Sequence, residues 1–171
     1  MTSGENQWEF SSPPELKAKA KSRKKARQAW AKKTKQQAPK NLDQRFSDLH
    51  DSAFSEYDCL NCANCCKTTS PMLFERDIER LSKALRMKPG DFTQEYLFLD
   101  IDGLYAFKQT PCPFLGADNR CQHYEDRPKA CRDFPHTQHR KMHNLLNLAV
   151  TNCTVCPVVD AIVDKLAQIQ P

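Results

Sequence analysis

The chain of 171 residues carries 26 Lys and Arg against 21 Asp and Glu, a formal net charge of +5, and it is long enough for one ordinary domain or a small domain with a tail. Leu, Ile, Val and Phe number 33, about 19% of the chain, which is a thin supply for one large core. No apolar run approaches the roughly 18 residues of a membrane span, and the first residues lack the pattern of a secretory signal. We therefore expect a cytoplasmic protein without a membrane partner.

Apolar residues and charge divide the chain near Tyr57. Residues 1–57 hold six of the 33 large apolar residues, with 12 cationic against seven acidic residues. Residues 58–171 hold the other 27, and their charges balance at 14 against 14. The sequence therefore predicts two parts, a basic arm with a linker helix over residues 1–57 and a cysteine-cluster metal-binding domain over residues 58–171.

The basic arm is richest in charge over residues 17–40, which contain 11 Lys and Arg and no acidic residue. Its Ala, Lys, Arg and Gln favour a helix that Pro39 would end. Only Leu16 and Trp30 are large and apolar, so the segment has almost nothing to bury, and charge repulsion predicts a frayed helix or disorder. Its cations could bind nucleic acid or a ribosome; the alternative is a solubilising tail.

The rest of the sequence predicts short helices and hairpins. Residues 42–54 have apolar side chains near helical spacing, and so do Leu73 to Leu85, at steps of three and four. Asp102-Gly103 between two apolar stretches is typical of a hairpin. Further elements are expected as a helical turn over 91–96, a tight turn at 116–119, a helix over 127–132 and an apolar-faced helix from Pro157. The expected fold class is α+β, a small metal-stapled domain of short helices and hairpins preceded by a basic helical or disordered arm.

The nine cysteines are the strongest chemical signal, because clustered thiols in a cytosolic chain indicate metal or redox chemistry rather than disulfides. Four of them form C-x-x-C-x-x-C-C, in which each two-residue spacing lets both thiolates face one metal. The others lie beside turn residues or form a second C-x-x-C. Cys66 and Cys131 have the alternative interpretation of small core residues. The candidate metal ligands are Cys59, Cys62, Cys65, Cys66, Cys112, Cys121, Cys131, Cys153 and Cys156.

Several motifs together resemble the YkgJ-like cysteine-cluster proteins. The matching residues are Cys59 to Cys66, Cys112-Pro113-Phe114-Leu115, Cys121 with Tyr124, and Arg127-Pro128 through Phe134-Pro135, so the resemblance covers roughly residues 55–136. It implies a zinc- or iron-chelating domain, labelled Fe–S oxidoreductase in some members, with a flagellin lysine N-methylase in one branch of much larger proteins. That family often has Gly where Asn64 stands here, and Asn also tolerates a left-handed backbone.

Histidine and arginine side chains offer weaker sites. Three histidines spaced three and four apart would share a face if their segment were helical, although a solvated basic face is the favoured interpretation: His136, His139 and His143. His123, two residues after a candidate ligand, could complete a mixed ligand set. Arg127 and Arg132 could donate to thiolates or to a substrate phosphate, or pair with neighbouring carboxylates.

We interpret the sequence as a metal-binding protein whose centre is structural or electron-carrying. An iron–sulfur cluster is slightly favoured over zinc, because bacterial ferredoxins use C-x-x-C-x-x-C and a Pro follows Cys156 here. Four ligands per centre would allow two centres and leave one cysteine over, for which Cys66 is the candidate. The alternatives are an enzyme, either an Fe–S oxidoreductase or a protein resembling lysine N-methylases, and a nucleic-acid- or ribosome-associated module using residues 17–40.

Overall fold

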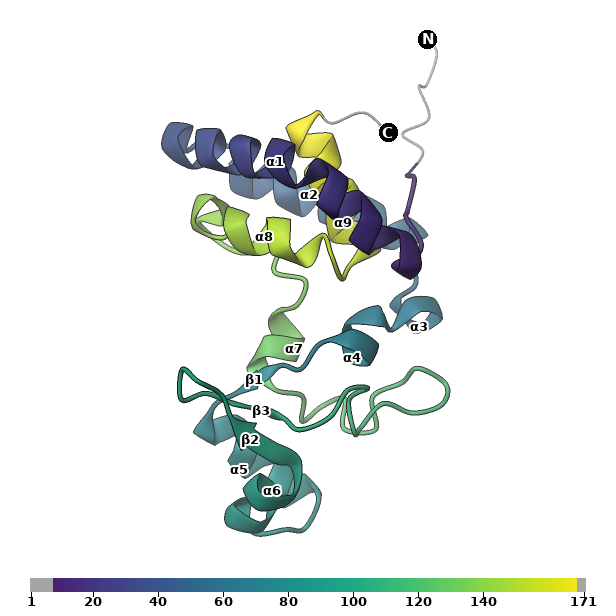
Figure 1. The fold of residues 1–171 in the computed structure, drawn as a ribbon, viewed down its shortest axis with the longest axis vertical. Helices are drawn as coiled ribbons and strands as arrows, with labels where there is room; N and C mark the ends of the chain where they lie inside the picture. The colour runs from purple at the N-terminus through teal and green to yellow at the C-terminus, as the bar shows by residue number, and fades with distance from the viewer. Residues whose placement is uncertain (1–7, 169–171) are drawn as a thin grey trace. The chain divides into compact units, whose positions relative to one another are not determined.

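The computed structural model describes residues 8–168, which form two compact units (Figure 1). The helical unit combines the chain up to residue 58 with the chain from residue 135, and the cysteine unit comprises residues 59–134. This division differs from the one expected at residue 57, because the C-terminal segment packs with the N-terminal helices. Both units together give the α+β class that the sequence predicts. No helix in the described part is long and apolar enough to cross a bilayer.

The helical unit is built around its last helix. Its elements are α1 (Pro13–Gln37), α2 (Leu42–Glu56), the 3-10 turn η1 (Met142–Asn144), α8 (Leu146–Asn152) and α9 (Pro157–Ala167). Helices α1, α2 and α8 each contact α9, as Figure 1 shows. Val158, Val159, Ile162 and Val163 of α9 are fully buried as a result. The apolar face expected from Pro157 onward is thus confirmed, and α2 confirms the helix expected over residues 42–54.

Helix α1 begins at a capping box and is ordered along 25 residues. The Ser12 backbone N–H donates to Glu15 Oε2 at 2.7 Å, and Pro13 occupies the first helical position, where it costs no hydrogen bond. At the other end Ala38 adopts a left-handed conformation with φ of 41°, and its N–H donates to the Thr34 carbonyl at 2.8 Å. Of the two forms expected for the arm, helical or disordered, the structure therefore shows the helical one.

The expectation that α1 buries almost nothing is wrong. Its inner face buries Leu16, Ala31 and, at 1% exposure, the Arg27 side chain. Arg27 Nη2 lies 2.5 Å from Asp160 Oδ1 and 2.7 Å from Asp164 Oδ1, on α9. Asp160 and Asp164 lie near the C-terminal end of the sequence. The sequence of the cationic segment by itself therefore does not reveal the acidic partners of its charges.

The cysteine unit combines short helices with a small sheet. Its elements are α3 (Cys59–Cys62), α4 (Asn64–Thr68), β1 (Met72–Leu73), α5 (Glu75–Ala84), α6 (Pro89–Tyr96), β2 (Leu97–Leu99), β3 (Tyr105–Phe107) and α7 (Lys129–Asp133). The antiparallel sheet has the order β1-β3-β2. The register pairs Met72 with Ala106 and Phe98 with Ala106 on one row. Helices α5, α6 and α7 confirm the short helices expected from the sequence.

The predicted hairpin joins β2 to β3 through residues 100–104. Asp100 Oδ1 accepts the N–H groups of Asp102 at 2.9 Å and Leu104 at 2.8 Å. Gly103 sits between them with φ of +76°, a conformation that other residues adopt at a cost. The turn therefore matches the Asp-Gly signal.

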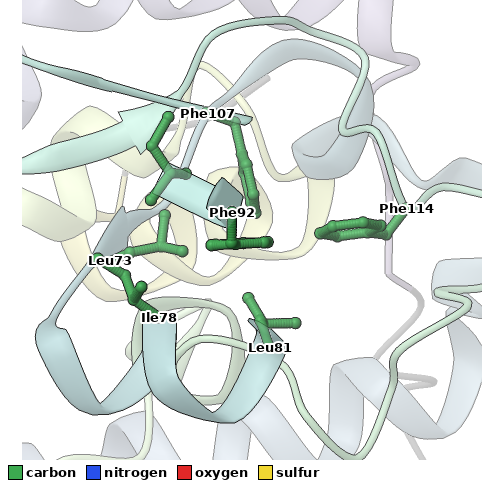
Figure 2. Close-up of a cluster of buried hydrophobic side chains, with 7 residues drawn as sticks. Leu73, Ile78, Leu81, Phe92, Phe107 and Phe114 are labelled. Carbon is green, nitrogen blue, oxygen red and sulfur yellow. The ribbon is translucent and has the colours of Figure 1, made fainter. Parts of the chain in front are cut away.

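The core of the cysteine unit lies between its sheet and helices α5 and α6. Figure 2 shows the apolar side chains converging around Phe92, which is fully buried. The Phe107 and Phe114 rings meet edge to face at 5.5 Å. The buried members of this core are Leu73, Ile78, Leu81, Phe92, Leu97, Phe107 and Phe114. Cys112 and Cys121 pack against the same core, which ties the candidate ligands to the fold.

Replacing Phe92 by alanine is expected to destabilise the cysteine unit by about 3–5 kcal/mol, because the ring fills the centre of a small core. Phe74 provides the matched control, since its ring is 53% exposed and its replacement by alanine should cost well under about 1 kcal/mol. Thermal unfolding of both variants measures the difference. Equal costs at the two positions would contradict the core described above.

Candidate metal centre

The C-x-x-C-x-x-C-C motif forms two short helices joined by one strained residue. Ala63 between them has φ of 48° and ψ of 21°, in the left-handed region. The left-handed position therefore falls at Ala63 and not at Asn64, which begins α4. The Asn64 N–H points back to Cys62 Sγ at 3.4 Å, a type of contact that stabilises thiolates in metal sites.

Two hydrogen bonds, one between backbone groups and one from a side chain, join this motif to the loop that carries Cys112 and Cys121. The Cys112 N–H donates to the Cys66 carbonyl at 2.8 Å. At the tip of the loop, Asn119 Nδ2 donates to the Leu60 carbonyl at 2.6 Å. Leu115 and Cys121 form an antiparallel bridge that closes the loop, and the Gly116 N–H donates to the Arg120 carbonyl at 2.7 Å. The tight turn expected at residues 116–119 is confirmed.

Cys131 reaches the same region on α7, which is held by a buried acid that the sequence does not single out. Asp77 of α5 is 2% exposed, and its Oδ1 accepts the Lys129 N–H at 3.0 Å and Arg80 Nη2 at 2.6 Å. Arg80 also donates to the Arg127 carbonyl at 2.7 Å. The only sequence signal for this anchor is the three-residue spacing of an acid and an arginine on one helix.

The charge of Cys66 influences the ionisation of three other thiols. Burial, followed by the charges of Cys66 and Cys121, raises the pKa of Cys112 to about 11. Burial and the charges of Cys66, Cys112 and Cys121 raise the pKa of Cys131 to about 12. The pKa of Cys121 is likewise raised by burial and by the charge of Cys66. The charge of Cys66 thus contributes to the raised pKa of all three other thiols, and the assignment of Cys66 as the cysteine left over stays a prediction.

Cys66 itself is the thiol that ionises most readily among the four. Its Sγ lies 3.9 Å from Cys65 Sγ, and the hydrogen bond between them, aided by Arg127 and Lys67, lowers the pKa of Cys66 to about 7. Lys67 also donates to the Cys62 carbonyl at 3.0 Å, which holds its charge beside the motif. Lys67 was not singled out by the sequence, although its position directly after the paired cysteines is a signal for it.

Arg127 is the cation that favours thiolates in this group. It lowers the pKa of Cys66 and opposes the burial that raises the pKa of Cys121 and Cys131. Its Nε donates to the Tyr124 carbonyl at 2.7 Å, and the guanidinium carbon lies 3.4 Å from the centre of the Tyr124 ring. These contacts hold the guanidinium in place, so its role is electrostatic.

The remaining arginine and histidine candidates take other partners. Arg132 Nη1 donates to the Arg127 carbonyl at 2.8 Å, and the His123 ring packs edge-on to Phe114 at 5.0 Å. The histidine segment of the helical unit is not a continuous helix, since η1 covers only residues 142–144. His136 and His139 still meet there, with their rings 5.4 Å apart.

The other candidate ligands have different surroundings. Cys59 is exposed and Cys62 half-buried in the motif, whereas Cys153 and Cys156 are buried in the helical unit. The Cys153 thiol donates to the Ala149 carbonyl at 3.3 Å, and burial raises the pKa of Cys153 to about 12. These two cysteines thus lie in a different compact unit from the other seven.

The donor set around Cys66 fits a metal by its chemistry. Negative charge on one thiol raises the pKa of the others, and a bound cation would replace that repulsion with attraction. Within residues 8–168, no group of three or more Cys, His, Asp and Glu side chains is arranged to hold a metal ion as it stands. Binding therefore requires the thiols to turn toward a common point.

Metal binding at these thiols is expected to release protons at neutral pH. With pKa values of about 11 at Cys112 and about 12 at Cys131, and a raised pKa at Cys121, these three groups are protonated at pH 7. Ligation by all three would release about three protons, so the apparent affinity should rise steeply between pH 6 and pH 8. Calorimetric titration in buffers of different ionisation enthalpy counts the protons. A release below one proton per metal would show that these thiols are not the ligands.

A comparison with protein families supports the same chemistry. The CxxCxxCC family, described as "Putative zinc- or iron-chelating domain", matches residues 58–156, a range that contains all nine cysteines. No curated protein and no solved structure matches the chain. The match covers more than half of the chain and agrees with the resemblance seen in the motifs. The chain belongs to the CxxCxxCC family of zinc- or iron-chelating domains.

Proposed function

We propose that the cysteine unit holds a metal centre whose ligands are Cys66, Cys112, Cys121 and Cys131. The observation that carries the proposal is the effect of the Cys66 charge on the pKa of Cys112, Cys121 and Cys131, which supports a common site for thiols from three distant parts of the chain. Backbone contacts support it, because the Cys112 N–H bonds the Cys66 carbonyl at 2.8 Å independently of any ionisation. Four thiolates are a complete ligand set for zinc or for an iron–sulfur cluster.

Of the two, an iron–sulfur cluster is the form we favour. The C-x-x-C-x-x-C spacing of Cys59, Cys62 and Cys65 is the spacing used by bacterial ferredoxins, and it leaves these three thiols for a second centre. Zinc held by the same four thiolates is the second candidate.

The role we propose for the centre is structural or electron-carrying, in the reducing cytoplasm where such thiols persist. The cysteine unit has a small core and six elements of only two to five residues, namely β1, β2, β3, α3, α4 and α7. Metal coordination supplies folding free energy in domains of this kind. Elements this short need such a constraint, since isolated helices of a few residues are unstable in water.

Anaerobic purification followed by metal, sulfide and absorption measurements tests the proposal. A brown protein with bound iron, acid-labile sulfide and broad absorbance near ~400 nm is the expected result for a cysteine-ligated cluster. A colourless protein with stoichiometric zinc would establish the second candidate. A protein that binds neither metal under anaerobic reconstitution would overturn the proposed function.

A further inference from the structure

The cations of α1 fall into two groups that the sequence alone does not separate. Lys19, Arg23 and Arg27 face α9 and are neutralised there by Asp160 and Asp164, with Lys19 Nζ lying 2.7 Å from Asp160 Oδ2. A second group is exposed and pairs with no acidic side chain in the described part of the chain. Six of its seven members are Lys17, Lys21, Lys24, Lys25, Lys32 and Lys35, and the seventh, Lys33, lies on another face of the helix.

These six lysines, called the lysine stripe below, share one face of the helix. At 3.6 residues per turn their positions fall within about 100° of arc, and from Lys17 to Lys35 the stripe is about 27 Å long. No acidic residue interrupts residues 17–40, so the surface along the stripe has one sign of charge. The buried residues Leu16, Ala20 and Ala31 lie on the adjoining face of α1, centred about 100° around the helix from the stripe.

We propose that the lysine stripe docks on the phosphate backbone of a nucleic-acid duplex. A row of cations about 27 Å long matches about eight base pairs of a duplex, given one phosphate per strand every 3.4 Å. Between Lys17 and Lys35 the only other residue within this arc is Gln28, so the stripe includes no aromatic ring on which unpaired bases could stack. The contact is therefore to the backbone and independent of base sequence.

An anionic membrane is the competing polyanion, and the packing of α1 disfavours it. Helices that lie on membranes insert an apolar face below the headgroups. In this protein the apolar face of α1 is covered by α8 and α9, and its buried Arg27 is bonded to Asp160 and Asp164. Freeing that face would break buried ion pairs. The same pairs hold α1 in place, so the lysines keep their spacing before the duplex binds.

The test compares two triple variants of the full chain. The first, Lys21→Gln, Lys25→Gln and Lys32→Gln, removes three charges from the stripe while keeping good helix formers. The control, Lys33→Gln, Lys83→Gln and Lys88→Gln, removes three exposed charges from elsewhere, one of them on α1 but off the stripe. Binding to a 20-base-pair duplex, as RNA and as DNA, is measured by fluorescence anisotropy between 50 and 200 mM salt, with thermal unfolding checked for each variant.

With six phosphate contacts, the slope of log affinity against log salt concentration should be about −5 for the native chain. The stripe variant should reduce the magnitude of this slope by about 3 and should weaken binding roughly tenfold or more. The control should keep the native slope. Binding to the RNA duplex, the DNA duplex or both supports the proposal. Equal slopes in the two variants, no duplex binding at 50 mM salt, or tighter binding to phosphatidylserine vesicles than to either duplex would overturn it.

Discussion

Replacing Cys121 by serine is expected to abolish metal binding at the centre around Cys66. Burial and the charge of Cys66 already act on the Cys121 thiol, and the Leu115–Cys121 bridge fixes its position beside Cys112. A hydroxyl does not replace a thiolate as a ligand to zinc or to an iron–sulfur cluster. Cys66→Ser should lose the metal equally, because Cys66 is the member of the group that influences the pKa of the other three.

Ser82→Ala is the matched control for these substitutions. Ser82 is buried in α5 of the same unit, and its hydroxyl donates to the Glu79 carbonyl at 3.1 Å without touching a thiol. Metal content by mass spectrometry of the native protein should be full for Ser82→Ala and below about a tenth of native for both cysteine variants. Full loading of Cys66→Ser, with loss at Cys121→Ser alone, would restore the interpretation of Cys66 as the spare thiol.

Replacing Arg27 by methionine is expected to destabilise the helical unit by about 3–5 kcal/mol, because it leaves Asp160 and Asp164 buried without their main cation. Methionine keeps the apolar length of the side chain, so the loss reports the charge. Arg23→Met is the control: Arg23 pairs with Asp164 but its side chain is 16% exposed, and its loss should cost about 1 kcal/mol. Chemical denaturation followed by far-ultraviolet circular dichroism measures both.

A cost below about 1 kcal/mol for Arg27→Met would contradict the packing of α1 on α9. It would also revive the expectation that the arm buries almost nothing. The structure instead predicts that deleting residues 1–40 destabilises the helical unit, because the deletion removes Leu16, Ala31 and Arg27 from its interior.

Local sequence patterns predicted most of the short elements correctly. The three- and four-residue spacing before Leu85 corresponds to α5, Asp102-Gly103 to the β2–β3 turn, and Pro157 to the first residue of α9. Each of these patterns lies within about a dozen consecutive residues. Helix capping, turn formation and the burial of one helix face depend on residues this close in sequence, so the patterns can be recognised without knowing the fold. The nine cysteines were equally visible, since their types and spacing are local facts.

What the sequence could not predict depends on contacts between distant parts of the chain. The burial of α1 requires Asp160 and Asp164, more than a hundred residues later, and the role of Cys66 requires the loop of Cys112 and Cys121. Asn64 tolerates a left-handed backbone, yet the turn between α3 and α4 places that conformation at Ala63. A left-handed backbone costs about 1–2 kcal/mol at a residue such as alanine.

X-ray absorption spectroscopy at the metal edge of the anaerobically purified protein tests the central claim most directly. The account predicts that sulfur atoms alone surround the metal at about 2.3 Å, with neighbouring iron atoms as well if the centre is an iron–sulfur cluster. A coordination sphere in which nitrogen or oxygen predominates would contradict a centre built from Cys66, Cys112, Cys121 and Cys131.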